Sequence, residues 1–428
     1  MANQSLSTTK DTQTGDSMKS RQIVMGVIFL LVAVFIWFVF VQSTTSDTQT
    51  TFVLSPGGAQ TVLPNFTFNS QFALKVLSIL CAAVGGYQLM KGFGKFTNIL
   101  LGLVGVLLIL SFLAWGASGG SINVGGMLRI AIMRSVPIVL GAMSGILCER
   151  VGVVNIAIEG MMITGALVGA VVGSLFGLWA GVLGGVIAGA LTASVHAMLS
   201  IKYKVNQIIS GTIINIFTTG LTAYIVTKLL QNRDWQYLNQ SGFFPSFNIP
   251  VLSKIPFLGP ILFSHNMFIY ATYILVIVLT IALFHTKWGL RLRSCGEHPK
   301  AADTLGINVN RMRYMGVILG GMMAGFAGTY LSLGSLGYFE QGMSSGRGFI
   351  GLAAMIFGQW TPVGSMGAGL LFGFAESLAT NLTILRFPFP PELLLTAPYI
   401  LTMVILAGVV GRSRGPAAAG EPYEKESL

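Results

Sequence analysis

The segment IVMGVIFLLVAVFIWFVFV, Ile23–Val41, is apolar throughout and contains no charged residue. A helix needs about 20 such residues to cross the hydrocarbon core of a bilayer. The segment is too long for the apolar region of a removable signal peptide and lacks a small-residue cleavage site, so we expect it to remain as an anchor. The whole chain is 53% hydrophobic and 9% charged, whereas soluble domains carry about 25% charged residues. The sequence therefore predicts an integral membrane protein.

Apolar runs of similar length recur along the chain and predict an all-α polytopic membrane protein with about 10–12 transmembrane helices. One run, Phe349–Gly358, is roughly half as long as a membrane span and predicts either a half-membrane helix or a short span. The other predicted spans are Phe72–Met90, Asn98–Gly116, Met127–Cys148, Ile156–Phe176, Leu178–Ser200, Gln207–Leu230, Met267–His285, Tyr314–Leu333, Gly364–Thr380 and Glu392–Val410.

These spans divide the chain into four parts. Residues 1–22 are rich in Ser, Thr, Gln and Asp and predict a disordered cytoplasmic tail. Residues 23–120 are expected to form an N-terminal extension with three transmembrane helices, and residues 121–411 a permease-like core. Residues 412–428 are expected to form a cytoplasmic C-terminal tail.

The formal net charge of +11 comes from Lys and Arg residues in short loops between the apolar runs. Such a distribution is typical of cytoplasmic loops, so it favours cytoplasmic positions for both termini and a lipid bilayer as the surroundings. We therefore predict no nucleic-acid partner. Alternating the spans across the membrane places Arg347 in an external loop.

Small residues repeat at helical spacing in two predicted spans, where they allow a neighbouring backbone to approach closely. The segment GMMITGALVG, which follows Glu159, also resembles GMMAGFAGTY, which follows Gly320. Transporters are often built from internal repeats, but Gly/Ala/Met-rich helices also resemble one another by chance. The residues at four-residue spacing are Gly181, Gly185 and Gly189 in one span and Gly321 and Gly325 in the other.

The residues that carry hydrolytic, redox or metal chemistry do not form a recognisable pattern. The four His residues have no metal-ligand spacing, and the three Cys residues lie in different segments. At Gly94-Lys95, Phe96 stands where a phosphate loop requires Ser or Thr. We therefore predict a transporter subunit and not an enzyme, without a catalytic, metal or cofactor site, and place any ATPase on another polypeptide.

Ionisable residues inside predicted spans are costly in lipid and are therefore candidate functional groups. Glu159 is near the expected cytoplasmic end of a span, where a carboxylate also favours the helix dipole, and Glu376 is mid-span. Arg134 is expected to reach toward the membrane interface. Neutral polar side chains nearby could bind an uncharged solute or link helices. The candidate substrate-pathway residues are Asn155, Glu159, Asn206, Gln207, Asn215, Gln359, Trp360 and Glu376.

The loop KWGLRLRSCGEHPKAADTLGINVNRMR, residues 287–313, contains boundary residues for a short helix outside the bilayer. Pro299 suits the first turn of a helix, and Gly306 suits the position just past its end. Ala301, Ala302 and Leu305 between them predict a small apolar face. An ordinary basic loop requires neither boundary residue, so we interpret this segment as a docking element.

Three segments together resemble the permease superfamily of bacterial ABC importers for branched-chain amino acids, ribose and nucleosides. They are GVVNIAIEGMM (152–162), GLRLRSCGEHPKAADTLGINVNRMRY (289–314) and GRGFIGLAAMIFGQWTPVG (346–364). The terminal GRSRGPAAAGEPYEKE (411–426) is similar to the nucleoside permeases of that superfamily. The chain departs from the usual Asn of the family at His298 and at Thr361.

The resemblance implies an ABC permease core with an internal pseudo-two-fold repeat, and a second homologous permease subunit that completes a heterodimer. It also implies a cytoplasmic ABC ATPase, which uses ATP and Mg, and an extracytoplasmic nucleoside-binding lipoprotein. The ATPase would dock on the 287–313 loop. The residues that match the coupling motif of the family are Gly296, Glu297, Pro299, Ala301, Ala302, Asp303 and Gly306.

The function we expect is nucleoside import across the bacterial plasma (inner) membrane by alternating access. Two alternatives remain open on the sequence. One is an ABC permease for a simple sugar such as ribose or for branched-chain amino acids. The other is an ion-coupled secondary transporter in which Glu159 and Glu376 exchange protons or cations.

Overall fold

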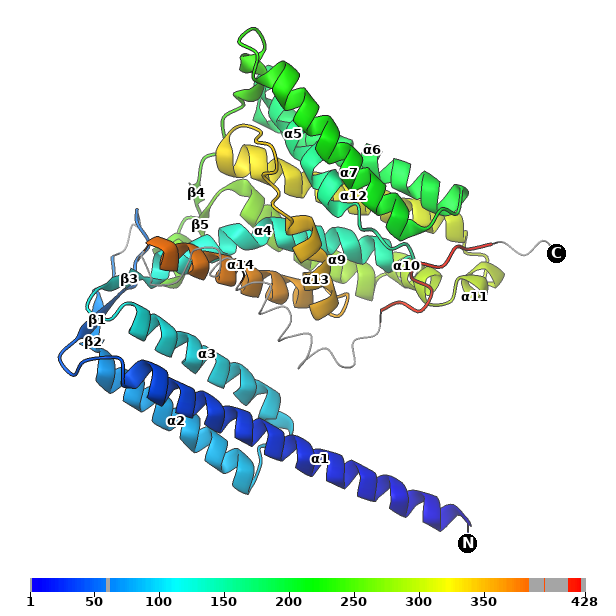
Figure 1. The fold of residues 1–428 in the computed structure, drawn as a ribbon. Coiled ribbons are helices and arrows are strands. Elements are labelled where there is room, and N and C mark those ends of the chain that lie inside the picture. The colour runs from blue at the N-terminus through cyan, green and yellow to red at the C-terminus, as the bar shows by residue number, and fades with distance from the viewer. Residues whose placement is uncertain (1, 59–61, 385–395, 397–414, 425–428) are drawn as a thin grey trace. The chain divides into compact units, whose positions relative to one another are not determined.

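The computed structural model describes residues 2–58, 62–384, 396 and 415–424, which are mainly helical (Figure 1). Among these residues, nine helices are long and apolar enough to cross a membrane. They coincide with the first nine predicted spans, from Ile23–Val41 to Tyr314–Leu333, and confirm an all-α polytopic membrane protein. The last predicted span, Glu392–Val410, lies outside the described residues.

The chain divides into two compact units, the first of which contains Met1–Gly126. Three helices form this unit, and the polar segments between and after them pair as a small sheet. Strand β1 is antiparallel to β2 and parallel to β3. The elements are α1 (Ala2–Phe35), η1 (Ile36–Val41), β1 (Gln49–Val53), β2 (Phe66–Asn69), α2 (Ser70–Met90), η2 (Gly94–Phe96), α3 (Thr97–Gly116) and β3 (Ser121–Asn123).

The N-terminal residues differ from the expectation for them. Residues 2–22, predicted to be disordered, form the first part of helix α1. Extending a helix that an apolar span has already nucleated adds one hydrogen bond for each residue ordered. The segment also contains no Pro, which would remove a donor and end the helix.

The second unit contains the remaining spans. Helices α4, α5 and α12 are largely buried in it, whereas α6, α7 and α9 expose much of their surface. Its principal elements are α4 (Val124–Glu149), α5 (Ile158–Phe176), α6 (Leu178–Ala197), η3 (Met198–Lys202), α7 (Gln207–Ile225), η4 (Val226–Leu230), α8 (Leu258–Leu262), α9 (Met267–His285), α10 (Lys287–Glu297), α11 (Pro299–Thr304), α12 (Val309–Thr329), η7 (Tyr330–Leu336), α13 (Arg347–Phe357) and α14 (Pro362–Ile384). Short elements in the loop between α7 and α9 are η5 (Gln236–Asn239), β4 (Phe247–Asn248), η6 (Leu252–Lys254) and β5 (Ser264–His265).

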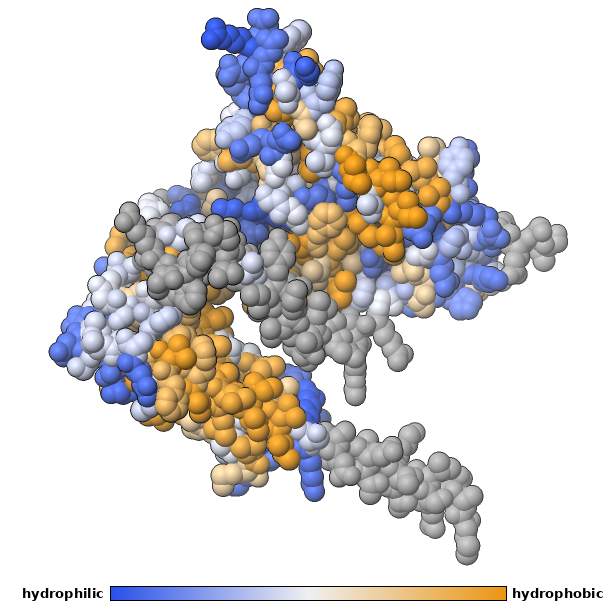
Figure 2. Space-filling view, in the orientation of Figure 1, coloured by the Kyte–Doolittle hydropathy of each residue, from blue (hydrophilic) through white to orange (hydrophobic). Residues whose placement is uncertain are grey.

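Apolar side chains cover the exposed surface of several spans, as contact with lipid requires. Figure 2 shows hydrophobic residues over the visible faces of α1–α3 in the first unit and of α7 in the second. On α7, Ile213, Ile216 and Phe217 are all more than half exposed. A soluble protein rarely exposes an apolar patch of this extent, so the patch supports insertion in a membrane.

Glycines hold α5, α6 and α12 close together, as their spacing predicts. A Cβ added at Gly189 in α6 would lie 2.4 Å from the carbonyl oxygen of Gly321 and 2.6 Å from the Cα of Gly325, both in α12. A Cβ at Gly165 in α5 would lie 2.6 Å from the carbonyl oxygen of Gly325. The two similar segments, GMMITGALVG in α5 and GMMAGFAGTY at the end of α12, therefore pack against each other with their backbones in contact.

We expect Gly189→Val to destabilise the second unit, since the new side chain must displace the backbone of α12. Overpacking of this kind typically costs ~1–3 kcal/mol. The matched control is Gly220→Val in α7, where an added Cβ meets no atom within 4 Å. Thermal unfolding in detergent should show a lower midpoint for the first variant only, and equal midpoints would contradict this packing argument.

Candidate functional site

The predicted docking helix is present as α11, and both of its ends follow from the residues there. Pro299 is its first residue, and the Nδ1 atom of His298 accepts a hydrogen bond from the backbone N–H of Ala301 at 3.2 Å. Asn at this position could cap a helix in the same way, which explains why His298 can replace it. Gly306, two residues past the end, has a φ of +79°, a backbone conformation that favours Gly.

The apolar residues of this segment do not share one face, contrary to the expectation. Ala302 is buried, while Ala301 and Leu305 are exposed, with Leu305 at 82%. Leu305 follows the last helical residue, so helical spacing no longer sets its direction. Ala302 therefore anchors α11 to the core, and Leu305 presents an apolar side chain to the solvent.

The C-terminal segment 415–424 lies against this region. The backbone N–H of Ala418 donates to the carbonyl of Gly296 at 2.8 Å, and that of Gly420 donates to the carbonyl of Gly152 at 3.2 Å. The carboxylate of Glu297 accepts from the N–H of Ala417 at 3.3 Å. Two of the predicted coupling residues, Gly296 and Glu297, therefore hold the C-terminal segment in place.

Charged side chains from other elements secure the end of the segment. Arg313 in α12 is buried, donates from Nη1 to the carbonyl of Glu421 at 2.8 Å, and lies 5.9 Å from the ring centroid of Tyr423. Lys204 forms an ion pair with Glu424. The hydrogen bond and the charge of Lys204 lower the pKa of the Glu424 carboxyl.

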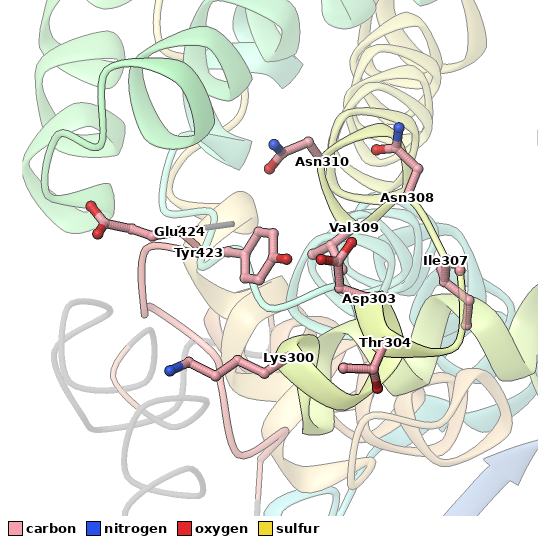
Figure 3. A pocket seen from close by; sticks show the side chains of 10 residues that line it. Lys300, Asp303, Thr304, Ile307, Asn308, Val309, Asn310, Tyr423 and Glu424 are labelled. Carbon is pink, nitrogen blue, oxygen red and sulfur yellow. The ribbon is translucent and has the colours of Figure 1, made fainter. Parts of the chain in front are cut away.

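Two adjoining clefts lie between α11 and the C-terminal segment. One, of about 610 Å³, is lined by Lys300 and Asp303 of α11, by the start of α12, and by Tyr423 and Glu424 (Figure 3). The other, of about 660 Å³, has His298 on one side and the C-terminal segment on the other. Both walls carry charged and apolar groups, a mixture that suits the docking of a protein partner.

Glu159 caps the short helix α13. Its Oε1 accepts from the hydroxyl of Ser344 at 2.6 Å and from the backbone N–H of Gly346 at 2.8 Å. Its Oε2 accepts from the N–H of Gly348 at 2.7 Å. The N-terminus of a helix has unpaired N–H groups and a partial positive charge. The carboxylate of Glu159 accepts hydrogen bonds from such N–H groups, and its negative charge interacts favourably with the helix dipole. Glu159 therefore has a structural partner for each oxygen.

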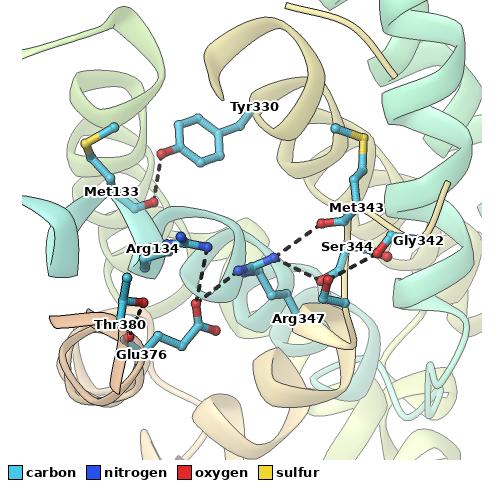
Figure 4. Close-up of polar contacts among 10 residues, drawn as sticks. Met133, Arg134, Tyr330, Gly342, Met343, Ser344, Arg347, Glu376 and Thr380 are labelled. Carbon is cyan, nitrogen blue, oxygen red and sulfur yellow. Dashed lines mark hydrogen bonds and ion pairs between the residues drawn. The ribbon is translucent and has the colours of Figure 1, made fainter. Parts of the chain in front are cut away.

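Glu376 joins two arginines inside the second unit (Figure 4). Its Oε2 lies 3.0 Å from Nη2 of Arg347 and 4.0 Å from Nη1 of Arg134. Arg347, predicted to lie in an external loop, is the first residue of α13, and its side chain is only 11% exposed. Arg134 was expected to reach toward the interface and instead turns to this carboxylate. The spacing of these residues along the chain contains no indication of the cluster.

The neutral candidate residues bond mainly to backbone groups of the segment that leads into α5. Asn215 in α7 accepts from the N–H of Gly160 and donates to the carbonyl of Ile156, both at 2.8 Å. Gln207 accepts from the N–H of Val154 at 2.6 Å. Asn155 and Asn206 make local bonds instead: Asn155 accepts from the N–H of Ala157, and Asn206 caps α7, the helix that follows it.

Gln359 and Trp360 form the corner between α13 and α14. Both have positive φ values, +54° and +52°. The indole Nε1 of Trp360 donates to Oε2 of Glu149 at 2.5 Å. The side chain of Arg150 donates to the backbone carbonyl of Trp360 at 3.0 Å. Thr361 accepts from the N–H of Gly364, as the usual Asn could. The corner is thus tied to the end of α4, away from the Glu376 cluster.

Comparison with known proteins agrees with this architecture. A family model described as the permease component of the branched-chain amino acid transport system matches residues 126–410. The chain belongs to this family. No solved structure matches it at a significant level.

Curated relatives include the guanosine ABC transporter permease protein NupQ of Bacillus subtilis, 42% identical over 69% of this chain and 95% of its own length. The nucleoside ABC transporter permease protein NupC of Lactococcus lactis is 36% identical over the same shares. The putative glucose ABC transporter permease protein TsgC13 of Haloferax volcanii is 31% identical over 70% of this chain and 98% of its own length. The first 125 or so residues precede the match to the family model.

We expect Glu159→Ala to destabilise the protein, because three donors at the start of α13 lose their acceptor. Each buried unsatisfied group costs ~1–3 kcal/mol. Glu159→Gln keeps one amide oxygen and should lose less, so thermal unfolding midpoints in detergent should fall in the order wild type, Gln, Ala. If Glu159 served ion coupling without capping α13, both variants would unfold at the wild-type temperature.

We expect Arg313→Met to release the C-terminal segment, since the segment loses a hydrogen bond from a buried charged donor worth ~1.5–3 kcal/mol. Hydrogen exchange at Ala418 and Gly420 should accelerate about tenfold or more. Lys204→Gln is the comparison variant, because an ion pair exposed to water is screened and contributes little to stability. Equal acceleration in the two variants would refute the central role of Arg313.

Proposed function

We propose that this chain is the permease subunit of an ATP-driven importer that moves nucleosides across the bacterial plasma membrane. Two of the relatives described above, NupQ and NupC, carry guanosine and nucleoside in their names and match almost their whole length. TsgC13, which has glucose in its name, supports the sugar alternative, but it is less similar to this chain than NupQ and NupC are. Membership of the ABC permease family also favours ATP-driven import over the ion-coupled alternative.

A separate ATPase, which hydrolyses ATP with Mg, would dock on the cytoplasmic loop 287–313. The observation that carries this proposal is Leu305, an apolar side chain 82% exposed, whose chain neighbours Thr304 and Gly306 line the first cleft. Such a side chain is well suited to be the central anchor of a protein interface. The C-terminal segment would form the other wall of the docking surface.

A movement of α11 would be transmitted to the membrane spans through the chain on either side of it. Only His298 separates it from α10, which follows α9, and α12 begins at Val309, shortly after Gly306. Closure of the ATPases could therefore tilt α9 and α12 and change which side of the membrane the pathway faces. This is the physical basis on which we propose alternating access.

The resemblance further supports three features of the complete transporter. A second homologous permease subunit would form a heterodimer with this chain, and an extracytoplasmic nucleoside-binding lipoprotein would deliver the substrate. Both termini would lie in the cytoplasm, since most Lys and Arg residues fall in the loops on that side.

We expect Leu305→Asp to abolish coupling without unfolding the permease, since exposed substitutions usually change stability by less than ~0.5 kcal/mol. The loss of an apolar anchor should weaken ATPase association about tenfold or more, with a parallel loss of nucleoside uptake. Association is measured by co-purification and uptake with labelled nucleoside. Leu305→Met, which keeps the apolar side chain, should behave as wild type. Undiminished association of the Asp variant would place the docking site elsewhere.

A further inference from the structure

Three interruptions of regular helix meet at one place in the second unit. Helix α4 contains Pro137, which has no N–H to donate to the carbonyl of Met133 one turn earlier. The hydroxyl of Tyr330 donates to that carbonyl instead, at 2.7 Å. Tyr330 begins the π-helical segment η7, a kind of distortion that is frequent at functional sites. The short helix α13 begins nearby with Arg347.

A cavity of about 330 Å³ lies between these interruptions. Such a volume is within the usual range for small-molecule sites, ~300–1,000 Å³. Its walls combine two guanidinium groups with aromatic and sulfur-containing side chains, as Figure 4 shows for several of them. The lining residues that matter below are Met133, Arg134, Tyr330, Met343 and Arg347. Glu376 does not itself line the cavity and lies against two of its lining residues, Arg134 and Arg347.

The charged groups beside the cavity lie near the middle of their helices, whereas Tyr330 and Leu336 lie in the last part of the span Val309–Leu336. Arg134 lies close to the centre of α4, and Glu376, which bonds Arg347, lies close to the centre of α14. Substrate sites of transporters are typically built beside interrupted helices of this kind. Polar groups held in lipid at such a cost are generally functional.

The charges around the cavity are close to balanced. Arg134 and Arg347 face the carboxylate of Glu376, and the carboxylate of Glu159 lies at the start of α13, close to Arg347. Two positive and two negative groups leave no excess charge that would call for an ionic ligand. A neutral ligand with hydrogen-bonding groups is therefore the better fit.

Hydrogen-bonding capacity remains available within the cluster. The contact between Arg134 and Glu376 is long, at 4.0 Å, and the Arg134 side chain is 45% exposed. The Nε atom of Arg347 is buried and has no acceptor among the described residues. A ligand that inserts between Arg134 and Glu376 would thus separate only a weak pair, and it would meet a donor beside an acceptor.

We propose that this cavity binds the base of a 6-oxopurine nucleoside, with Arg134 donating to O6 and Glu376 accepting from N1–H. This inference rests on the proposed function and assigns its substrate site. A 6-oxopurine has an acceptor, O6, directly beside a donor, N1–H, and guanine adds a second donor at N2. Guanidinium groups are the commonest partners of the O6 and N7 acceptors of guanine, and a carboxylate accepts from adjacent N–H groups.

The side chains around the cluster suit a flat ring. Tyr330, Met133 and Met343 line the same cavity, and thioethers make favourable contacts with aromatic rings. Adenine presents the reversed pattern, with a donor at the 6-position and an acceptor at N1. It would set its amino group against a guanidinium and its N1 against a carboxylate, so the site should reject it.

The test is uptake by the complete importer, assembled with its cognate subunits. Uptake is measured separately with labelled guanosine and labelled adenosine, and unlabelled guanosine, inosine, adenosine and cytidine serve as competitors of labelled guanosine. Guanosine and inosine should compete well, and adenosine and cytidine poorly. Glu376→Gln and Arg134→Met should each lower the ratio of guanosine to adenosine uptake by about tenfold or more, as expected for the loss of a specific base contact. Arg233→Met, in an exposed loop, is the matched control and should leave the ratio unchanged.

The ratio separates a binding role from a structural one, since a folding defect lowers uptake of both nucleosides equally. Arg134 is partly exposed, so Arg134→Met tests the proposal even if Glu376→Gln fails to fold. Nucleoside uptake with an unchanged ratio in the variants, or a wild-type preference for adenosine, would overturn this inference and leave the proposed function standing. A wild-type importer that takes up no nucleoside would overturn both.

Discussion

Hydrocarbon offers no hydrogen-bond partner to a backbone N–H or C=O, so every interruption of a helix at membrane depth requires a partner from the protein itself. In the second unit, Glu159 supplies acceptors for the start of α13, and Asn215 supplies one for the start of α5. Tyr330 supplies the donor that Pro137 lacks. These polar bonds determine where the spans can break and which elements must lie beside each break.

The same constraint connects the fold to its function. A half-length helix and a π-helical segment leave space that regular packed helices would fill, and the cavity beside Arg134 and Arg347 occupies that space. Glycine contacts between α6 and α12 allow the surrounding helices to remain close despite the breaks. At the cytoplasmic end that we propose for it, α11 is tied to the body by Ala302 and to the C-terminal segment through Glu297.

Much of the candidate site could be placed from the sequence, because part of it depends on local chemistry. Pro299 and Gly306 marked the ends of α11, and the glycine spacing indicated the close approach of two spans. The burial of Arg347 could not be predicted, because a cation at the start of a short helix has the same sequence pattern whether it is exposed or part of a buried cluster. The partners of the amide residues were equally hidden, since an amide can serve a solute or a neighbouring helix.

The sequence by itself determined the class of protein, nearly all of the described spans, the short helix α13 and the helix α11. Each of these depends on composition or spacing within a few turns of the chain, where apolar length and helix boundaries are physically set. Only the tertiary structure decided that Glu159 caps α13, that Arg134, Arg347 and Glu376 form one cluster, and that Arg313 holds the C-terminal segment. Those contacts join residues as far apart along the chain as Arg134 and Glu376, and they exist only because lipid-exposed helices pack so that their buried polar groups satisfy one another.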